Sequence, residues 1–427
     1  MAIFPTIFPT LPKYPGPYDV GTFDVEIPLP PEKTKKFEAI DTHVETVLVR
    51  FFYPADLSKV APKKRLTSPS WLPQPALEYA KGYATFFKQP VIPTSLAISL
   101  FVYYTHITAV ENAPPLVPPV SRFPVLIFSH GLGGSRNAYS QWCGSIASYG
   151  VFVAAIEHRD GSAPTSVVRA GTEKQSSIPY RRITEQNDQT KPLRSTQLAQ
   201  RTYEVAQLVS VLRDINHGKE IDVIGVEKLS ILDRFEGFLN TKKGEMVMAG
   251  HSFGAATTVA VCKNNENVEM DYPLKDEFKA ALCLDIWAMV RLTSMDVVLI
   301  FQPLSAISTA PLTIPSLHVI SDQFRKWKDN YHNIPALLRE SREASAFAKV
   351  FYMKGSAHLS QSDFNLLFPN TCRRFFHANQ AADKVMHANI RAGVEFLRVV
   401  GVEGVQGERD DIFEEEIDEW VELEKDR

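Results

Sequence analysis

The residues best suited to chemistry form the segment Gly250-His-Ser-Phe-Gly254. It follows the apolar run Met246-Val-Met-Ala249 and precedes a run of small residues, Ala255 to Val261, that is compatible with a helix. A G-x-S-x-G segment between a strand and a helix is typical of a nucleophile elbow, because the glycines permit a sharp turn that exposes the serine Oγ. The sequence therefore predicts Ser252 as a catalytic nucleophile.

A serine hydroxyl is a weak nucleophile at neutral pH, so Ser252 needs a histidine base. His358 fits this role, because it lies in the small-residue loop Gly355-Ser-Ala-His358 directly after the apolar run Val350 to Met353. The base of a Ser, Asp/Glu, His series is expected at such a place. The other histidines after the serine lie in an apolar run, a charged stretch or predicted helices: His318, His332, His377 and His387.

Two carboxylates could orient this histidine, namely Asp285 after the run Ala280 to Leu284 and Asp322 after the run Leu317 to Ser321. Both follow a predicted strand, so their position in the sheet does not separate them. The common arrangement, with the acid two strands after the nucleophile, favours Asp322, whereas some enzymes use the strand in between. Asp285 lies in an apolar setting beside Trp287, where a carboxylate would be costly unless it is paired. The residues alone leave the choice open.

A glycine-rich segment, Phe128-Ser-His-Gly-Leu-Gly-Gly134, follows another predicted strand. Its glycines allow backbone N–H groups to point into a cavity, as in the HGGG-type oxyanion loops of lipases and esterases. We predict that the amides of Leu132 and Phe253 stabilise an oxyanion. The histidines that flank this site, His130 and His251, are predicted to be structural.

The elements that must position these residues are short apolar, β-branched runs separated by helical patterns. The clearest helical pattern covers residues 195–216. Strands that alternate with helices favour a mainly parallel sheet flanked by helices, and with the elbow this predicts an α/β-hydrolase fold. Residues 45–53 are expected to form an antiparallel lead-in strand. The buried strands are predicted at 125–128, 151–156, 246–249, 280–284, 317–320 and 350–353.

The length of 427 residues would suit two or three domains of roughly 150 residues each. The residues needed for one site run from Leu132 to His358, however, so we predict a single α/β-hydrolase domain over residues 1–407. It would carry a proline-rich N-terminal lead-in and an insertion near residues 66–120. Residues 408–427 include 11 acidic and 3 basic residues and are predicted to form an acidic tail or a terminal helix.

Charge and cysteine content exclude several classes of function. The chain has 46 Lys and Arg against 49 Asp and Glu, so no basic field marks a nucleic-acid-binding protein. Its four cysteines form no CxxC pair, and we expect free thiols, no metal and no cofactor. The N-terminus lacks the features of a signal peptide, which favours a cytoplasmic location. The oligomeric state stays open.

One apolar stretch bears on membrane contact. Residues 94–110 contain no Asp, Glu, Lys or Arg, but they fall short of the about 20 apolar residues that a transmembrane helix needs. They could form a buried helix or an apolar surface that rests on lipid. Aromatic residues and two lysines precede them, which favours peripheral contact with a membrane or lipoprotein surface. These residues are Tyr79, Lys81, Tyr83, Phe86, Phe87 and Lys88.

Several separate blocks resemble the platelet-activating factor acetylhydrolase family, the calcium-independent serine lipases known as group VII phospholipases A2. In order and approximate spacing they cover most of residues 16–376. The GHSFG, EHRD and LDxW blocks together form a pattern that is specific to this family. The blocks are Gly16-Pro-Tyr-Asp-Val-Gly21, Trp71-Leu-Pro73, Phe128-Ser-His-Gly-Leu-Gly133, Ala154-Ala-Ile-Glu-His-Arg-Asp160, Gly250-His-Ser-Phe-Gly254, Leu284-Asp-Ile-Trp287 and Gly355-Ser-Ala-His-Leu-Ser-Gln-Ser-Asp-Phe364.

The resemblance implies Asp285 rather than Asp322 as the acid, together with Ser252, His358 and the amides of Leu132 and Phe253. It also implies a phospholipid substrate, cleaved at an sn-2 ester with a short or oxidised acyl chain. A general short-chain carboxylesterase or polyester hydrolase would use the same triad, and a non-catalytic lipid-binding scaffold is the alternative of another class. We expect Glu157-His-Arg-Asp160 to be an ion-paired scaffold.

The sequence also departs from the family pattern. Ala255 replaces the usual second glycine after the elbow, and Ala288-Met-Val-Arg291 replaces the proline and methionine that commonly follow the LDxW block. The long apolar stretch from Val297 to Pro315 comes next. We therefore expect the acyl pocket or the lipid-facing rim to differ from that of the family.

Overall fold

The computed structural model describes residues 10–60, 67–182, 191–225, 231–263, 274, 276–287, 312–331, 334, 341–342, 347–414 and 418–423. Several features discussed above lie outside these residues: His332, the 288–291 segment and most of the 297–315 stretch. The described residues include both loops of the expected active site and the strands that carry them.

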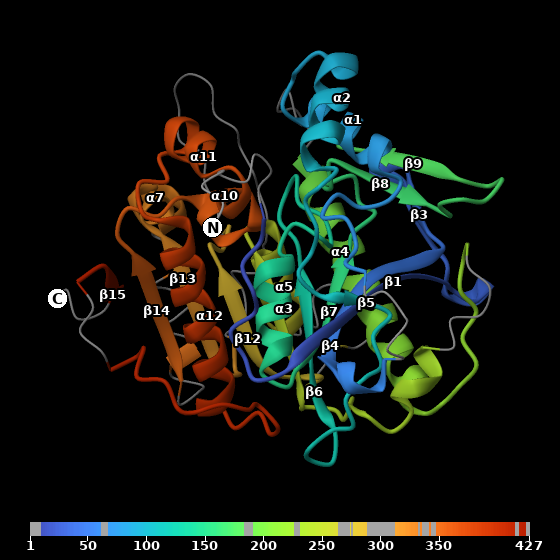
Figure 1. Cartoon of the computed structure of the whole chain (residues 1–427). Helices are drawn as coiled ribbons and strands as arrows, with labels where there is room; N and C mark the ends of the chain where they lie inside the picture. Colours follow the sequence, from blue (N-terminus) through green and yellow to red (C-terminus); the bar gives the residue numbers. More distant parts are fainter. Residues whose placement is uncertain are drawn as a thin grey trace, which may run out of the picture.

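An 11-stranded sheet runs through the described part of the molecule (Figure 1). Strand β10 (Leu239–Asn240) lies beside β6, off the main path. The order along the main path is β15 (Trp420–Glu422), β14 (Ala348–Met353), β13 (Ser316–Ser321), β12 (Phe278–Leu284), β11 (Met246–His251), β6 (Phe123–Ser129), β7 (Phe152–Glu157), β4 (Thr46–Ala55), β1 (Asp19–Pro28) and β5 (Val110–Glu111).

Neighbouring strands from β14 through β7 are parallel. Strand β15 pairs antiparallel with β14, β4 with β7, and β1 with β4, whereas β5 pairs parallel with β1. The apolar runs at 125–128, 151–156, 246–249, 280–284, 317–320 and 350–353 form strands of this sheet, as predicted, except that Val151 precedes β7 by one residue. The lead-in strand is also confirmed, because β4 contains most of residues 45–53. Strands buried on both faces carry continuous apolar runs, which is why they were recognisable.

Helices cover both faces of the sheet. Helices α3 (Ser140–Ser148) and α12 (Ala382–Val399) pack in one core, and α4 (Lys191–Asn216) packs in the other. Leu126 faces the first core and Ile127 the second, since successive side chains of a strand alternate between faces. Helix α5 (Phe253–Lys263) contacts α4 and follows β11 directly. Together these elements confirm the expected α/β-hydrolase fold.

Shorter elements gather around the carboxyl ends of the parallel strands. In Figure 1 helices α1 (Ala76–Phe86) and α2 (Val91–Val102) lie at the same end of the molecule as α10 (Asp363–Leu367) and α11 (Pro369–Phe376). Further short elements include α7 (Asp322–Lys326), α8 (Lys328–Tyr331), and the hairpins β2 (Lys35–Phe37) with β3 (Thr42–Val44) and β8 (Thr165–Val168) with β9 (Ser176–Pro179).

The apolar stretch 94–110 is only partly buried. One face of α2 and of the turn that follows is open to solvent, with exposed fractions of 76% for Ile92, 60% for Leu96, 70% for Leu100 and 68% for Tyr103. The buried-helix interpretation is therefore wrong for this face, because nothing in the described chain covers it. No helix among the described residues combines the length and the apolar character that crossing a bilayer requires.

The acidic C-terminal region contacts the body of the protein. Strand β15 pairs antiparallel with β14 at the edge of the sheet. Upstream of it, Arg391 of α12 donates to Asp410, with a distance of 2.7 Å between Nη2 and Oδ1. Ion pairs and a short strand thus hold the described part of this acidic segment. The four cysteines are free thiols, as predicted.

Candidate active site

The turn between β11 and α5 holds Ser252 in a strained conformation. Its φ angle is 57°, in the left-handed region that non-glycine residues rarely adopt, and its exposed fraction is 6%. A Cβ atom on Gly254 would lie 1.9 Å from the Ser129 carbonyl oxygen, and one on Gly250 would lie 2.3 Å from the Gly254 oxygen. Both positions therefore require glycine, and the sharp elbow predicted from the sequence is present.

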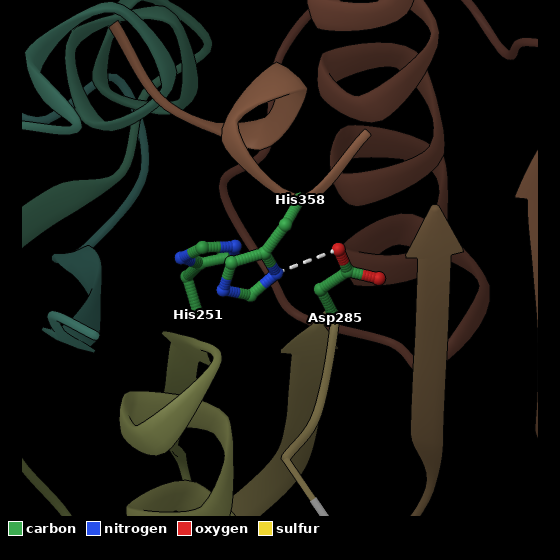
Figure 2. A group of neighbouring side chains, drawn as sticks. All are labelled: His251, Asp285 and His358. Atoms are coloured by element: carbon green, nitrogen blue, oxygen red, sulfur yellow. Dashed lines mark hydrogen bonds and ion pairs between the residues drawn. The ribbon is translucent and has the colours of Figure 1, made fainter. Parts of the chain in front are cut away.

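His358 and Asp285 are joined by a hydrogen bond, drawn in Figure 2, with 2.9 Å between His358 Nδ1 and Asp285 Oδ2. Asp285 is fully buried and also accepts from the Ser321 hydroxyl at 2.7 Å. The His358 ring stacks on Phe324, with 4.2 Å between ring centroids. When Nδ1–H donates to the carboxylate, Nε2 is left as the acceptor that a general base requires.

Asp322 takes a different set of partners. Its carboxylate accepts from Lys326 at 2.8 Å, from Arg325 and from the Gly355 amide. Partial burial alone would raise the pKa of Asp322, but the Lys326 and Gly355 hydrogen bonds outweigh burial and lower the pKa. Of the two candidate acids, the structure brings Asp285, and not Asp322, to His358.

The glycine-rich loop after β6 lies against the elbow. A Cβ atom on Gly131 would lie 3.0 Å from the Ser252 Cβ. The Gly131 amide donates to the Tyr139 hydroxyl and the Gly133 amide to the Ser162 carbonyl. Neither the amide of Leu132 nor that of Phe253 has an acceptor among the described residues. These two amides, the predicted oxyanion donors, are therefore available to a ligand.

His251 shares the site with His358, and their rings lie 4.4 Å apart between centroids (Figure 2). His251 Nδ1 bonds to the Tyr139 hydroxyl at 2.8 Å. Burial and the neighbouring His358 hold the pKa of His251 well below its ordinary value, so the ring is neutral. One ligand atom each from His251, Asp285 and His358 lie within 4.8 Å of one another, a spacing that could hold a metal ion. Hydrogen bonds already engage all three side chains.

The Glu157-His-Arg-Asp160 block at the end of β7 forms the predicted scaffold, with ion pairs at three of its residues and a hydrogen bond between His158 and Glu204 at the fourth. Burial raises the pKa of Glu204 to about 8 and holds the pKa of His158 well below its ordinary value, so that pair carries no net charge. The four residues of the block pair, respectively, with Arg136 at 2.6 Å, Glu204 at 2.5 Å, Glu26 at 2.9 Å and Arg201 at 2.8 Å.

An apolar pocket of about 510 Å³ opens beside the loop that carries His358. Leu359, the next residue in the chain, contributes to its wall. The rest of the lining comes from helices on both sides, including Tyr83 of α1, Val102 of α2 and Phe375 of α11. Such a lining suits a hydrocarbon chain better than a polar ligand.

The mainly parallel sheet, the covering helices and the elbow between β11 and α5 place the protein in the α/β-hydrolase class. A solved ferulic acid esterase from Streptomyces cinnamoneus has the same fold, with a TM-score of 0.59 over 97% of this chain and 99% of that chain. The two sequences are 14% identical, so this likeness concerns the fold alone.

Residues 7–411 match the family model described as platelet-activating factor acetylhydrolase, isoform II, and the chain belongs to this family. It is 32% identical over 435 residues to a putative phospholipase A2 of Schizosaccharomyces pombe, covering 94% of each chain. It is 27% identical over 344 residues to a platelet-activating factor acetylhydrolase of Gallus gallus, covering 75% of this chain and 72% of the relative. The protein is thus an ester hydrolase of the phospholipase A2-like type.

Proposed function

We propose that this protein cleaves the sn-2 ester of phospholipids that carry a short or oxidised acyl chain, releasing a lysophospholipid and a free acid. The observation that carries the proposal is the hydrogen bond between Asp285 and His358 beside the strained Ser252 elbow. Membership of the acetylhydrolase family supports the choice of substrate.

In the proposed reaction, His358 Nε2 takes the proton of the Ser252 hydroxyl as Oγ attacks the ester carbonyl. Asp285 holds the imidazole orientation and stabilises the imidazolium that forms. The intermediate then expels the lysophospholipid alkoxide, which leaves with the proton from His358. Water, activated by the same histidine, cleaves the acyl-enzyme and releases the free acid. The amides of Leu132 and Phe253 stabilise the oxyanion in both steps.

The apolar pocket supports a lipid over a small soluble ester as the substrate. Its wall includes Leu359, so a hydrocarbon chain in the pocket would lie close to His358. We propose that one apolar chain of the phospholipid occupies this pocket while the ester reaches Ser252. A soluble ester without such a chain would gain none of this binding energy.

The test is a substrate profile. We expect a phospholipid with an sn-2 acetyl group to be hydrolysed with a kcat/KM at least about tenfold above that of p-nitrophenyl acetate and of a phospholipid with a long sn-2 chain. Equal or better turnover of p-nitrophenyl esters would instead indicate a general carboxylesterase. Phospholipid binding with no hydrolysis of any ester would indicate a lipid-binding scaffold.

Peripheral contact with a lipid surface is a second part of the proposal. The exposed side chains of Ile92, Leu96 and Leu100 recur every four residues, so they lie on one face of α2. Val102 of the same helix lines the apolar pocket. A helix that offers an apolar face to a lipid surface and borders the pocket would bring a bound phospholipid close to the site.

Placing charges on this face should weaken lipid binding without harming the chemistry. We expect Leu96→Asp combined with Leu100→Asp to lower binding to phosphatidylcholine vesicles at least about tenfold, since burying each leucine in lipid is worth about 1.5–3 kcal/mol. Vesicle flotation measures the binding, and hydrolysis of a water-soluble ester should be unchanged. Val399→Asp, which alters an exposed valine of α12, is the matched control. Undiminished flotation of the double variant would contradict the proposal.

A further inference from the structure

We infer that Arg201 is a positioning residue that holds together the two backbone segments whose amides would bind the oxyanion. In this arrangement, Asp160 of the Glu157-His-Arg-Asp160 block serves to fix the Arg201 guanidinium. The inference rests on the proposed function and extends it, because it assigns a role in the reaction to a buried ion pair remote from the elbow in sequence.

Arg201 lies in α4, and its side chain is fully buried. Its Nε donates to Asp160 Oδ2 at 2.8 Å, and the Asp160 side chain is fully buried as well. Burial alone would raise the pKa of Asp160, but Arg201 reverses this effect and the pKa is lowered, so the carboxylate stays ionised. The ion pair leaves both Nη atoms of the guanidinium free to reach other groups.

These two Nη atoms hold the loop that carries Leu132. Nη1 donates to the His130 carbonyl at 2.7 Å, and Nη2 donates to the Ser162 hydroxyl at 2.6 Å. The Ser162 carbonyl in turn accepts from the Gly133 amide at 2.8 Å. Contacts with Arg201, one direct and one through Ser162, therefore hold the chain on both sides of Leu132.

The same guanidinium also holds the start of α5. It lies over the Phe253 ring, with 4.5 Å between Arg201 Cζ and the ring centroid, a distance at which a cation and an aromatic face attract. Nη1 is also 3.4 Å from the Thr257 hydroxyl, which donates to the Phe253 carbonyl at 3.0 Å. One side chain thus contacts both segments of the proposed oxyanion site.

Such a clamp matters because oxyanion donors act through fixed geometry. The two amides belong to turns after different strands, β6 and β11, and the sheet holds the strands but not the turns. The planar guanidinium offers several donors in a rigid fork, whereas lysine offers a single flexible ammonium group. Arg201→Lys keeps a positive charge beside Asp160 and removes the fork. The variant therefore tests the positioning of the two amides without changing the net charge of the core.

The experiment measures kcat, KM and the inhibition constant of an alkyl trifluoromethyl ketone, whose adduct with the serine places an oxyanion between the two amides. Rates are expressed per active site, counted by covalent labelling with an organophosphate. We expect Arg201→Lys to lower kcat about 10- to 100-fold with KM nearly unchanged, since loss of one whole oxyanion donor costs about 10²–10³. The inhibition constant of the ketone should rise by the same factor.

Arg159→Lys is the matched control. Arg159 is also a buried, ion-paired arginine, it belongs to the Glu157-His-Arg-Asp160 block, and its side chain contacts neither oxyanion segment. Its kcat per active site should stay within about twofold of wild type. Ser162→Ala removes the hydrogen bonds of the Ser162 hydroxyl with Arg201 and Asp160 and should lower kcat several-fold. This variant tests the inference if Arg201→Lys folds poorly.

The results separate this inference from the proposed function. Wild-type protein that resists organophosphate labelling and hydrolyses no ester would overturn the proposed function and the inference together. Active wild-type enzyme whose Arg201→Lys variant retains kcat and ketone affinity would overturn the inference alone. A fall in kcat with unaltered ketone affinity, or an equal fall in Arg159→Lys, would also overturn it.

Discussion

Ser252→Ala is expected to lower kcat for ester hydrolysis by at least ~10³-fold and to abolish covalent labelling by an organophosphate. The alanine variant keeps the strained elbow but removes the atom that forms the acyl-enzyme. KM should change little, because the pocket and the donor amides are untouched. Steady-state kinetics and mass spectrometry of the labelled protein measure the two effects.

The control for this variant is Ser58→Ala, which alters a serine in a surface 3₁₀ turn and should leave both measurements unchanged. A second serine makes the labelling site informative. Ser129 Oγ is 2.8 Å from His158 Nε2, and His158 Nδ1 is 2.5 Å from Glu204. This Ser-His-Glu series has the connectivity of a triad but is buried away from solvent. A label found on Ser129, or full activity in Ser252→Ala, would contradict the assignment.

Asp285→Asn is expected to lower kcat about 10⁴-fold, the size of effect that follows when an asparagine favours the wrong histidine tautomer. The amide group can donate to His358 Nδ1, which would place the imidazole proton on Nε2 and leave no acceptor for the Ser252 hydroxyl. Kinetics on a phospholipid with an sn-2 acetyl group measure the loss, and KM should stay close to the wild-type value.

Asp322→Asn is the matched variant, because it makes the same chemical change in the other candidate acid. Its carboxylate pairs with Arg325 and Lys326 rather than with His358. We therefore expect kcat within a few-fold of wild type. If Asp322→Asn were the crippled variant and Asp285→Asn the active one, the geometry at His358 would not be that of the working enzyme.

Much of the fold was predictable because local sequence patterns report burial. Strands of a parallel sheet that is covered on both faces are continuous apolar runs. Strands β6, β11 and β14 could therefore be located from these runs in the sequence alone. The elbow could be located because its steric demands select glycine at two fixed positions. Ser252 and His358 were then predicted as nucleophile and base, because one lies in the turn after β11 and the other in the loop after β14.

The choice of acid could not be made from the residues, because Asp285 and Asp322 both follow strands. What distinguishes them are long-range contacts: the Ser321 hydroxyl bonds to Asp285, and Lys326 bonds to Asp322. The resemblance to a family favoured Asp285, a choice that periodicity could not make. Arg201 was missed for a similar reason, since nothing in the helical pattern of residues 195–216 indicates which polar side chain enters the core.

The exposed face of α2 was left undecided for a different reason. An uncharged apolar stretch indicates that a segment avoids water, but it does not indicate whether protein or lipid covers each face. Helix α2 has one side of each kind, since Val102 is buried in the protein and Leu100 is exposed. Sequence composition averages over the faces of a helix, and only the packed structure separates them.

The close approach at Gly254 has a consequence for how this enzyme can change. One added carbon atom there would meet the Ser129 carbonyl oxygen at 1.9 Å, so even alanine would force α5 away from β6. These two elements lead into the two proposed oxyanion donors. The spacing of the two proposed donors thus depends on the absence of a methyl group at Gly254.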